Sequence, residues 1–291
     1  MTPHTFVAED SADLWLSASG FGRFSRCEVQ WLRHHTEPSV EEPTAPMVLG
    51  TLVHRLLGAW WTGTGNQFAV ADEYNAAIED WIQSLPEDAR AQVDRHMLPS
   101  YFERATTIVD RYANMYMGDR KRFGRTQLEI PFELPFRLPF CSGKRVGIRG
   151  YIDAAHTKGR GKGKVWLREF KTMASWQRMR RVAFDPQPFL YMYAWTQMTG
   201  KAPEGIIFDG ISTYEYKTKQ PVEKSFQQVV LPYDKDQIDN VMGAYAAMAD
   251  RAIGLLGGAV PVKALSDDCL WCPYRIGCVI PEHTEATAPT L

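Results

Sequence analysis

Val146-Gly-Ile-Arg-Gly-Tyr-Ile-Asp153 and Val165-Trp-Leu-Arg-Glu-Phe-Lys171 are the two stretches that decide the fold. Apolar and polar residues alternate in both, and a period of two is typical of β-strands. Between them lies the glycine-spaced basic stretch Lys158 to Lys164, which predicts a turn. The two stretches are therefore expected to pair as a hairpin.

This hairpin would bring two carboxylates and an ammonium group together. Alternation places Glu169 and Lys171 on one face, and Asp153 lies near them across the ladder. Two carboxylates can hold a hard divalent cation such as Mg²⁺, and a lysine can offset negative charge on a phosphate. The groups favour metal-assisted hydrolysis of a phosphodiester. Acidic and basic residues also alternate on ordinary exposed strands, so this pattern alone does not establish a site.

Helical and strand patterns lie on both sides of the hairpin. Upstream, an apolar stripe at helical spacing has His54 beside it, a position more typical of a packed core histidine than of a ligand. Together the patterns predict an α/β fold with a small mixed sheet flanked by helices. The stripe consists of Leu49, Leu52, Val53, Leu56, Leu57, Trp60 and Trp61; further helices are expected over 72–85, 101–117, 186–198 and 234–256, and further strands over 128–136, 205–214 and 226–231.

Composition limits the class of protein. The 291 residues carry a net charge of −1, so any attraction to nucleic acid must come from local patches. Two such patches are Lys158 to Lys164 and Arg178-Met-Arg180-Arg181, each of which is individually typical of a solvated surface. No apolar run approaches the roughly 18 residues of a membrane span, and no signal peptide is evident. We expect a cytoplasmic protein without a membrane partner.

Cysteine spacing predicts a second site. Three thiols form Cys269-x-x-Cys272-x5-Cys278, and Cys27 stands alone near the other end, with Cys141 as the spare. In a cytosolic protein, grouped cysteines more often hold metal than form disulfides. The spacing favours an iron–sulfur cluster over a structural zinc ion, because zinc sites usually offer two close pairs. Unrelated buried cysteines are the remaining alternative.

Several short motifs occur in the order found in one nuclease family. They are Gly50-Thr-Leu-Val-His54, Gly150-Tyr-Ile-Asp153, Glu169-Phe-Lys171-Thr and Gln187-x-x-x-Tyr191. Together they resemble the PD-(D/E)XK nuclease superfamily, and the RecB-like branch in particular. The Ser17-Ala-Ser19 to Cys27 opening and the cysteine-rich tail are similar to its iron–sulfur members, the AddB C-terminal nuclease and the CRISPR-associated exonucleases.

The resemblance implies a restriction-endonuclease-like core and a role for each motif. The chain would be a single nuclease domain over residues 1–291, in which Asp153, Glu169 and Lys171 are catalytic and Lys171 positions or activates the attacking water. The implied ligands of Mg²⁺ or Mn²⁺ are His54, Asp153, Glu169 and the Phe170 carbonyl; the implied DNA-binding residues are Gln187, Tyr191, Arg178, Arg180 and Arg181, with Trp176 and Tyr191 able to stack on bases.

The resemblance also implies a [4Fe–4S] cluster that joins the two ends of the chain. Cys27, Cys269, Cys272 and Cys278 would hold it within a lobe formed by residues 14–35 and 263–283. One departure stands beside the first thiol: Glu28 occupies the position where the family often has proline.

The expected function is that of a metal-dependent DNA exonuclease that prefers single-stranded or frayed ends. No G-x-x-x-x-G-K-[ST] phosphate loop occurs, so unwinding would need a partner such as a helicase or recombination protein. Recombination, repair or end-processing in a bacterial or phage-infected cell would all use such an enzyme. The alternatives are a non-catalytic iron–sulfur DNA-binding or adaptor protein of the same fold, and a zinc-stabilised protein with no role on nucleic acid.

Overall fold

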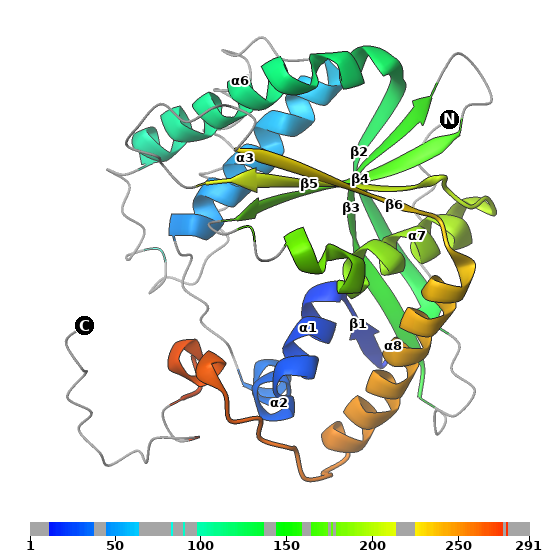
Figure 1. The fold of residues 1–291 in the computed structure, drawn as a ribbon. Coiled ribbons are helices and arrows are strands. Elements are labelled where there is room, and N and C mark those ends of the chain that lie inside the picture. Colours follow the sequence, from blue (N-terminus) through cyan, green and yellow to red (C-terminus); the bar gives the residue numbers. More distant parts are fainter. Residues whose placement is uncertain are drawn as a thin grey trace. The chain divides into compact units, whose positions relative to one another are not determined.

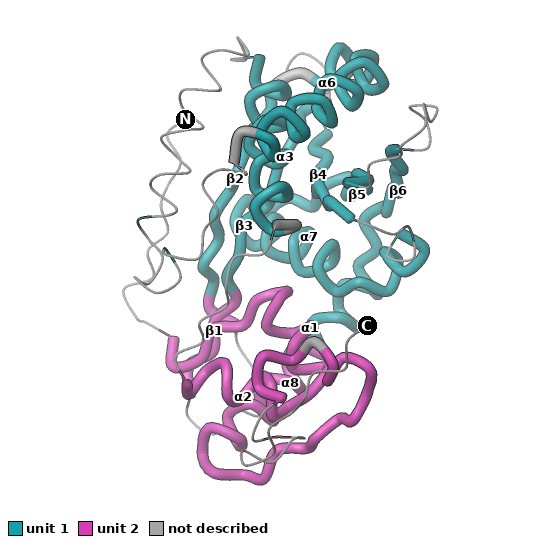
Figure 2. Tube along the Cα trace, turned by 90° about the vertical axis from the view of Figure 1, so that its left-hand side faces the viewer, with its two compact units in different colours: residues 1–9, 42–134, 149–243 teal, residues 10–41, 135–148, 244–291 magenta. Residues whose placement is uncertain are grey.

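The structure, a computed structural model, separates into two compact units (Figure 2). Unit 1 comprises residues 1–9, 42–134 and 149–243, and unit 2 comprises residues 10–41, 135–148 and 244–291. The prediction of a single nuclease domain over 1–291 stays a prediction. The structure describes residues 12–37, 45–63, 83, 90, 98–136, 144–158, 164–173, 176, 179–213, 225–275 and 278.

Unit 1 is built around a mixed sheet (Figure 1). The predicted hairpin is present, because β3 and β4 are antiparallel. β5 and β6 also pair antiparallel. β4 and β5 are parallel, which requires a crossover connection between them. β2 pairs with β3. The strands are β2 (Phe123–Phe136), β3 (Val146–Lys158), β4 (Val165–Met173), β5 (Gly205–Ser212) and β6 (Phe226–Pro232).

Helices cover both faces of this sheet. The apolar stripe predicted upstream lies on α3 (Ala45–Thr62), which packs with α6 (Leu98–Arg122) over one face and shares a core with Phe170. On the opposite face, α7 (Pro186–Thr199) contacts β4 and β5 (Figure 1). The expected α/β fold, a mixed sheet flanked by helices, is therefore confirmed. The helix expected over 72–85 lies almost wholly outside the described residues.

Local sequence signals set the ends of α7, the crossover helix. Asp185 precedes it, and its carboxylate accepts a hydrogen bond of 2.9 Å from the Gln187 backbone N–H, which satisfies one of the free donors of the first turn. Pro186 occupies the first turn, where its missing N–H costs nothing. The helix ends at Gly200, whose φ of 68° lies in the left-handed region that favours glycine. The start of this helix fixes where Gln187 lies.

Unit 2 contains short elements and an ionic anchor between two of its segments. Glu28 is that anchor: its carboxylate accepts from Arg251 Nε at 2.9 Å, from Arg251 Nη2 at 2.7 Å and from the Val262 N–H at 2.8 Å. The predicted helix 234–256 is observed, and Gly258 with φ of 99° follows its end. The elements are β1 (Leu14–Leu16), which pairs in parallel with Val146–Ile148, α1 (Ala18–Arg26), α2 (Glu28–Thr36), the second half of α8 (Lys235–Leu256) and the 3-10 helix η3 (Asp267–Trp271).

None of the described helices is both long enough and apolar enough to cross a membrane.

Candidate active site

Asp153 lies where the paired part of β3 and β4 ends. The antiparallel register runs from Thr157 opposite Val165 to Ala154 opposite Arg168, and Asp153 is the next residue of β3. Its Oδ2 accepts a hydrogen bond of 2.8 Å from the Phe170 backbone N–H. The carboxylate thus replaces the strand partner that this N–H lacks, and it is held beside the part of β4 that carries Glu169 and Lys171.

Glu169 is buried, with 2% of its surface exposed, and its two oxygens have different surroundings. Oε1 accepts from Gln187 Nε2 at 2.7 Å and from Lys171 Nζ at 3.4 Å. Oε2 is buried and has no hydrogen-bond partner among the described residues. Lys171 Nζ also donates to Gln187 Oε1 at 3.2 Å, so lysine, glutamate and glutamine form one cluster.

The pKa of Glu169 reflects this environment. Burial raises it well above the ordinary value, the nearby Asp153 carboxylate raises it further, and Lys171 opposes both effects. The Glu169 carboxyl therefore binds its proton more tightly than a carboxyl in water does. An unpartnered buried oxygen beside a second carboxylate fits a divalent cation, because hard cations take oxygen ligands and offset their charge.

His54 extends from α3 to the same point. Its Nδ1 lies 3.5 Å from Asp153 Oδ2, and its ring meets Phe170 edge to face with centroids 6.1 Å apart. Burial lowers the pKa of His54; Asp153 and a backbone hydrogen bond with Phe170 oppose this change, and Lys171 adds to it. A neutral imidazole is the form that binds metals. His54 thus contacts a carboxylate as well as an aromatic ring.

The residues predicted as metal ligands lie together, but not in ligand geometry. Among the residues that the structure describes, no group of three or more His, Cys, Asp or Glu side chains could hold a metal ion as placed. The cause is visible in the contacts: Asp153 is turned to the Phe170 N–H, and Glu169 Oε1 is turned to Gln187 and Lys171.

The predicted DNA-binding residues differ in their surroundings. Gln187 Nε2 donates to the Tyr191 hydroxyl at 2.7 Å and also to Glu169, so Gln187 faces the cluster of Glu169 and Lys171. Tyr191 is only 6% exposed and packs edge to face on Phe132. The expectation that its ring stacks on a base is therefore wrong for this arrangement, because the helix that carries it is buried on several sides. Its hydroxyl contacts Gln187 instead.

The two basic patches are described only in part. Arg180 and Arg181 are exposed on the 3-10 helix η1 (Met179–Phe184), whereas Arg178 lies outside the described residues. Of the stretch between β3 and β4, Lys164 is placed on the surface and pairs with Glu204 at 2.7 Å. Trp176 is partly buried against the small core cluster on the α7 side of the sheet, so it is not an open stacking surface.

A comparison with protein families identifies the family of this chain. Residues 15–279 match the family profile of the PD-(D/E)XK nuclease superfamily. The chain belongs to this superfamily. The match is to the superfamily as a whole, so the RecB-like iron–sulfur branch stays a prediction.

One solved structure shares the fold at low sequence identity. A candidate exonuclease from Eubacterium rectale aligns with a TM-score of 0.53 and 15% identity, covering 93% of this chain and 92% of that chain. An alkaline exonuclease from Laribacter hongkongensis aligns with a TM-score of 0.27 and 14% identity, covering 70% of this chain and 88% of that chain, a likeness that supports no conclusion. A search of curated proteins with this sequence found no match.

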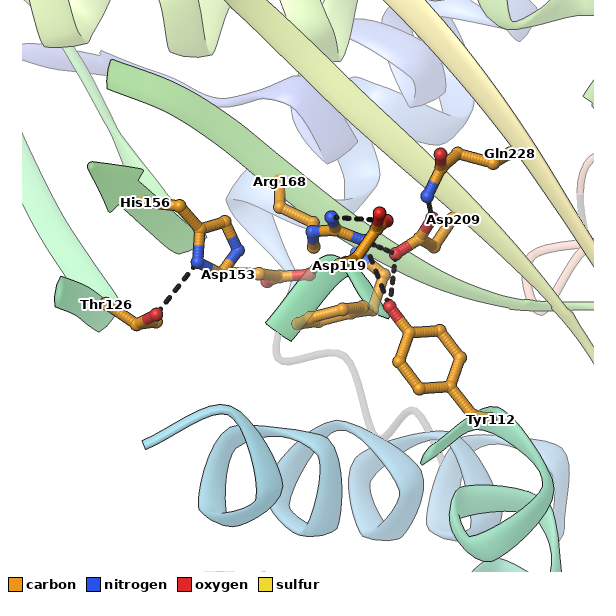
Figure 3. A network of polar contacts seen from close by, with 9 residues as sticks. Tyr112, Asp119, Thr126, Asp153, His156, Arg168, Asp209 and Gln228 are labelled. Carbon is orange, nitrogen blue, oxygen red and sulfur yellow. Dashed lines mark hydrogen bonds and ion pairs between the residues drawn. The ribbon is translucent and has the colours of Figure 1, made fainter. Parts of the chain in front are cut away.

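A buried polar network on the opposite face of β4 was not predicted (Figure 3). Arg168, fully buried, forms an ion pair with Asp209 of β5, and Tyr112 of α6 donates to the same carboxylate at 2.6 Å. Gln228 donates to the other oxygen of Asp209 at 2.8 Å, and the guanidinium lies 4.5 Å from the centre of the Trp61 ring. The available signal was Asp209, a lone carboxylate within the apolar stretch 205–212.

The four cysteines predicted to act together surround one small pocket within unit 2. Cys27 lies at the junction of α1 and α2, Cys269 lies on η3, and Cys272 and Cys278 follow it. Burial raises the pKa of the Cys272 thiol, and proximity to the other three sulfur atoms raises it further. All four are free thiols. The arrangement fits a four-thiolate cofactor; Cys141 lies outside the described residues.

The surroundings of Glu169 predict that this residue makes the folded protein less stable as pH rises. A carboxyl whose pKa is raised by folding binds its proton more tightly in the folded state than in the unfolded state. The stability that this proton contributes is therefore lost as pH rises above 4.5, the ordinary pKa of the carboxyl. In chelator at pH 8, Glu169→Gln should melt a few degrees above wild type. Mn²⁺ should raise the melting temperature of wild type but not of Glu169→Gln, as followed by differential scanning fluorimetry.

The control is Glu204→Gln, which removes an exposed carboxylate paired with Lys164. It should behave as wild type at every pH and keep the response to Mn²⁺. Equal stabilisation of Glu169→Gln and wild type by Mn²⁺ would contradict a metal role for Glu169.

Proposed function

We propose that this protein is a metal-dependent deoxyribonuclease that works as an exonuclease. The observation that carries the proposal is the buried Glu169 carboxyl with an unpartnered oxygen, placed beside Asp153, His54 and Lys171. A structural strand has no need for a buried carboxyl group whose ionisation a neighbouring carboxylate opposes. Such local conflicts are expected at sites kept for chemistry.

The residues would divide the work of hydrolysis among them. His54, Asp153, Glu169 and the Phe170 carbonyl would hold Mg²⁺ or Mn²⁺, which activates water and offsets charge on the phosphate when bound. Lys171, partly exposed, would orient the attacking water and stabilise the negative charge on the oxygens of the five-coordinate phosphorus. Gln187 keeps Lys171 and Glu169 in place, because its amide donates to one and accepts from the other.

A non-catalytic DNA-binding or adaptor protein of the same fold is the second candidate. It would share the sheet and the exposed Arg180 and Arg181, but it would need neither the paired carboxyl groups nor the Lys171–Gln187–Glu169 cluster. Because all of these groups converge in the structure, the catalytic interpretation has more support.

Purified protein should cleave DNA in the presence of Mg²⁺ or Mn²⁺. Asp153→Ala, Glu169→Ala and Lys171→Ala should each lower the rate by about a hundredfold or more, since each removes a group needed in the transition state. Lys235→Ala, which removes an exposed lysine at the start of α8 and outside both basic patches, is the matched control and should stay active. Labelled oligonucleotides followed on denaturing gels give the rates.

A folded, metal-bound wild type that leaves both single- and double-stranded DNA intact would favour the adaptor alternative. Full activity in Lys171→Ala would point to a contaminating nuclease.

The substrate form that we propose is a free end, single-stranded or frayed. The chain carries a net charge of −1, so it offers little attraction to a long duplex, and Arg180 and Arg181 provide a local backbone contact near α7. Unwinding by a helicase or recombination protein would supply such ends in recombination, repair or end-processing. A cytoplasmic location belongs to the same proposal.

Linear single-stranded DNA should be degraded much faster than a circle of the same sequence. Reversal of charge at Arg180 and Arg181 should weaken DNA binding and flatten its salt dependence, by about one unit of slope for each phosphate that the protein no longer neutralises. Equal degradation of linear and circular strands would show that no end is needed and that the enzyme is an endonuclease.

For the cysteine pocket we propose a [4Fe–4S] cluster held by Cys27, Cys269, Cys272 and Cys278. Its role is structural, because it closes a long loop between residues 14–35 and 263–283 and so restricts the unfolded chain. Support comes from the four free thiols around one pocket. A structural zinc ion is the competing occupant.

Protein purified without oxygen should be brown and contain iron. Alanine at any of Cys27, Cys269, Cys272 or Cys278 should remove iron and visible absorption, whereas Cys141→Ala should retain both. If the wild-type protein is colourless and contains stoichiometric zinc, the pocket holds a zinc ion and the cluster proposal is wrong. If Cys141→Ala loses iron and Cys27→Ala keeps it, the assignment of Cys27 is wrong.

A further inference from the structure

A polar pocket of unit 1 has no role in the site described above. It lies between the first half of α6 and the ends of β5 and β6, with a volume of about 400 Å³. Two arginines of α6, Arg104 and Arg111, line it on one side. Ser212, Thr213 and Ser225 line it on the other side. The pocket therefore combines guanidinium groups with hydroxyl-bearing residues.

The walls of this pocket are fixed by backbone contacts. The Thr213 N–H donates to the Met173 carbonyl at 3.0 Å, and the Ser212 N–H donates to the Ser225 carbonyl at 2.9 Å. Arg104 donates through Nη2 to the Thr213 carbonyl. Ser212 and Ser225 are buried, so their positions follow from the sheet. Arg111 lies two turns after Arg104 on the same side of α6 and is exposed.

These groups favour an anion as the ligand. Glu103 is the carboxylate among the lining residues; it is exposed, and the two arginines outnumber it. Guanidinium groups bind phosphate oxygens in a bidentate manner, and hydroxyls donate further hydrogen bonds to them. A phosphate group therefore matches the pocket better than a metal ion or an apolar molecule.

The pocket lies close to the catalytic strand. Within the parallel pair, Lys171 is opposite Gly210 and Met173 is opposite Ser212, so the pocket begins two residues beyond Lys171. Two strand residues span about 7 Å. The carboxyl ends of parallel strands share one edge of a sheet, where ligands of α/β proteins commonly bind.

From these observations we infer that the pocket binds a backbone phosphate of the substrate strand, separate from the phosphate that is cleaved. This inference rests on the proposed nuclease function and adds a second anchor for the strand. Arg111 is the residue that would reach the phosphate, while Arg104 holds the Thr213 carbonyl and shapes the wall. The subsite would fix the strand's position relative to Glu169 and Lys171, and hence which bond is cut.

The test combines a protein variant with a modified substrate. Binding of a single-stranded oligonucleotide is measured with Ca²⁺ in place of Mg²⁺, and each phosphate in turn is replaced by an uncharged methylphosphonate. In wild type, one position other than the scissile one should weaken binding by roughly five- to tenfold, as expected for one charge-assisted contact. In Arg111→Glu, this position should have an effect below about twofold, and Arg111→Lys should restore part of it.

Arg122→Glu is the matched control, because it makes the same charge change at the end of the same helix and outside the pocket. It should keep the wild-type pattern. If wild type binds and cleaves DNA but Arg111→Glu shows an unchanged methylphosphonate pattern, the subsite is wrong and the nuclease proposal stands. If wild type neither binds nor cleaves DNA, both fail.

A free nucleotide is the other source of a phosphate. Binding of thymidine monophosphate is therefore measured by calorimetry with the same variants. Tight binding of the nucleotide that depends on Arg111, without any change in the methylphosphonate pattern, would overturn the assignment to the strand.

Discussion

The ion pair between Arg168 and Asp209 fixes the register of β4 against β5, and the arrangement of the active site depends on that register. Arg168 is fully buried, and removal of one partner from a buried pair costs about 3–5 kcal/mol because the other charge is left uncompensated. A slip by one residue would turn Arg168 to the α7 side and Glu169 to the side of Tyr112. The main effect of the network is therefore to select one pairing of β4 with β5, and its contribution to net stability is secondary.

β4 presents a buried polar side chain to each face of the sheet. On the α6 side, Arg168 pairs with Asp209, which also accepts from Tyr112 and Gln228. Arg168 Nε and Nη2 have no hydrogen bond among the described residues, although Nη2 lies 3.6 Å from Asp119 Oδ2. On the α7 side, Glu169 keeps one oxygen without a partner among the described residues, and under the proposed function a cation would contact that oxygen.

Much of this arrangement could be predicted from sequence, for reasons that differ by element. The α3 stripe and the β3–β4 hairpin each have one buried face, so their periodicity records their position directly. The hairpin then brings Asp153, Glu169 and Lys171 together, because antiparallel pairing is a local constraint.

The Arg168–Asp209–Tyr112 network could not be predicted from the sequence, because its members come from distant parts of the chain and polar residues on strands are normally predicted to be exposed. The burial of Tyr191 was missed for a related reason: α7 is apolar on most sides, and no single polar face indicates which residues meet solvent.

Glu28, the residue that departs from the family pattern beside Cys27, helps to bring the cysteine-bearing segments together. By accepting from Arg251 and from the Val262 N–H, it joins the start of α2 to the segment that leads to Cys269. The thiols are thus gathered by contacts that involve no sulfur atom. Small zinc domains fold only when metal draws their ligands together. Here the protein would fold with its four thiols already close together, and the cofactor would then bind to this preformed site.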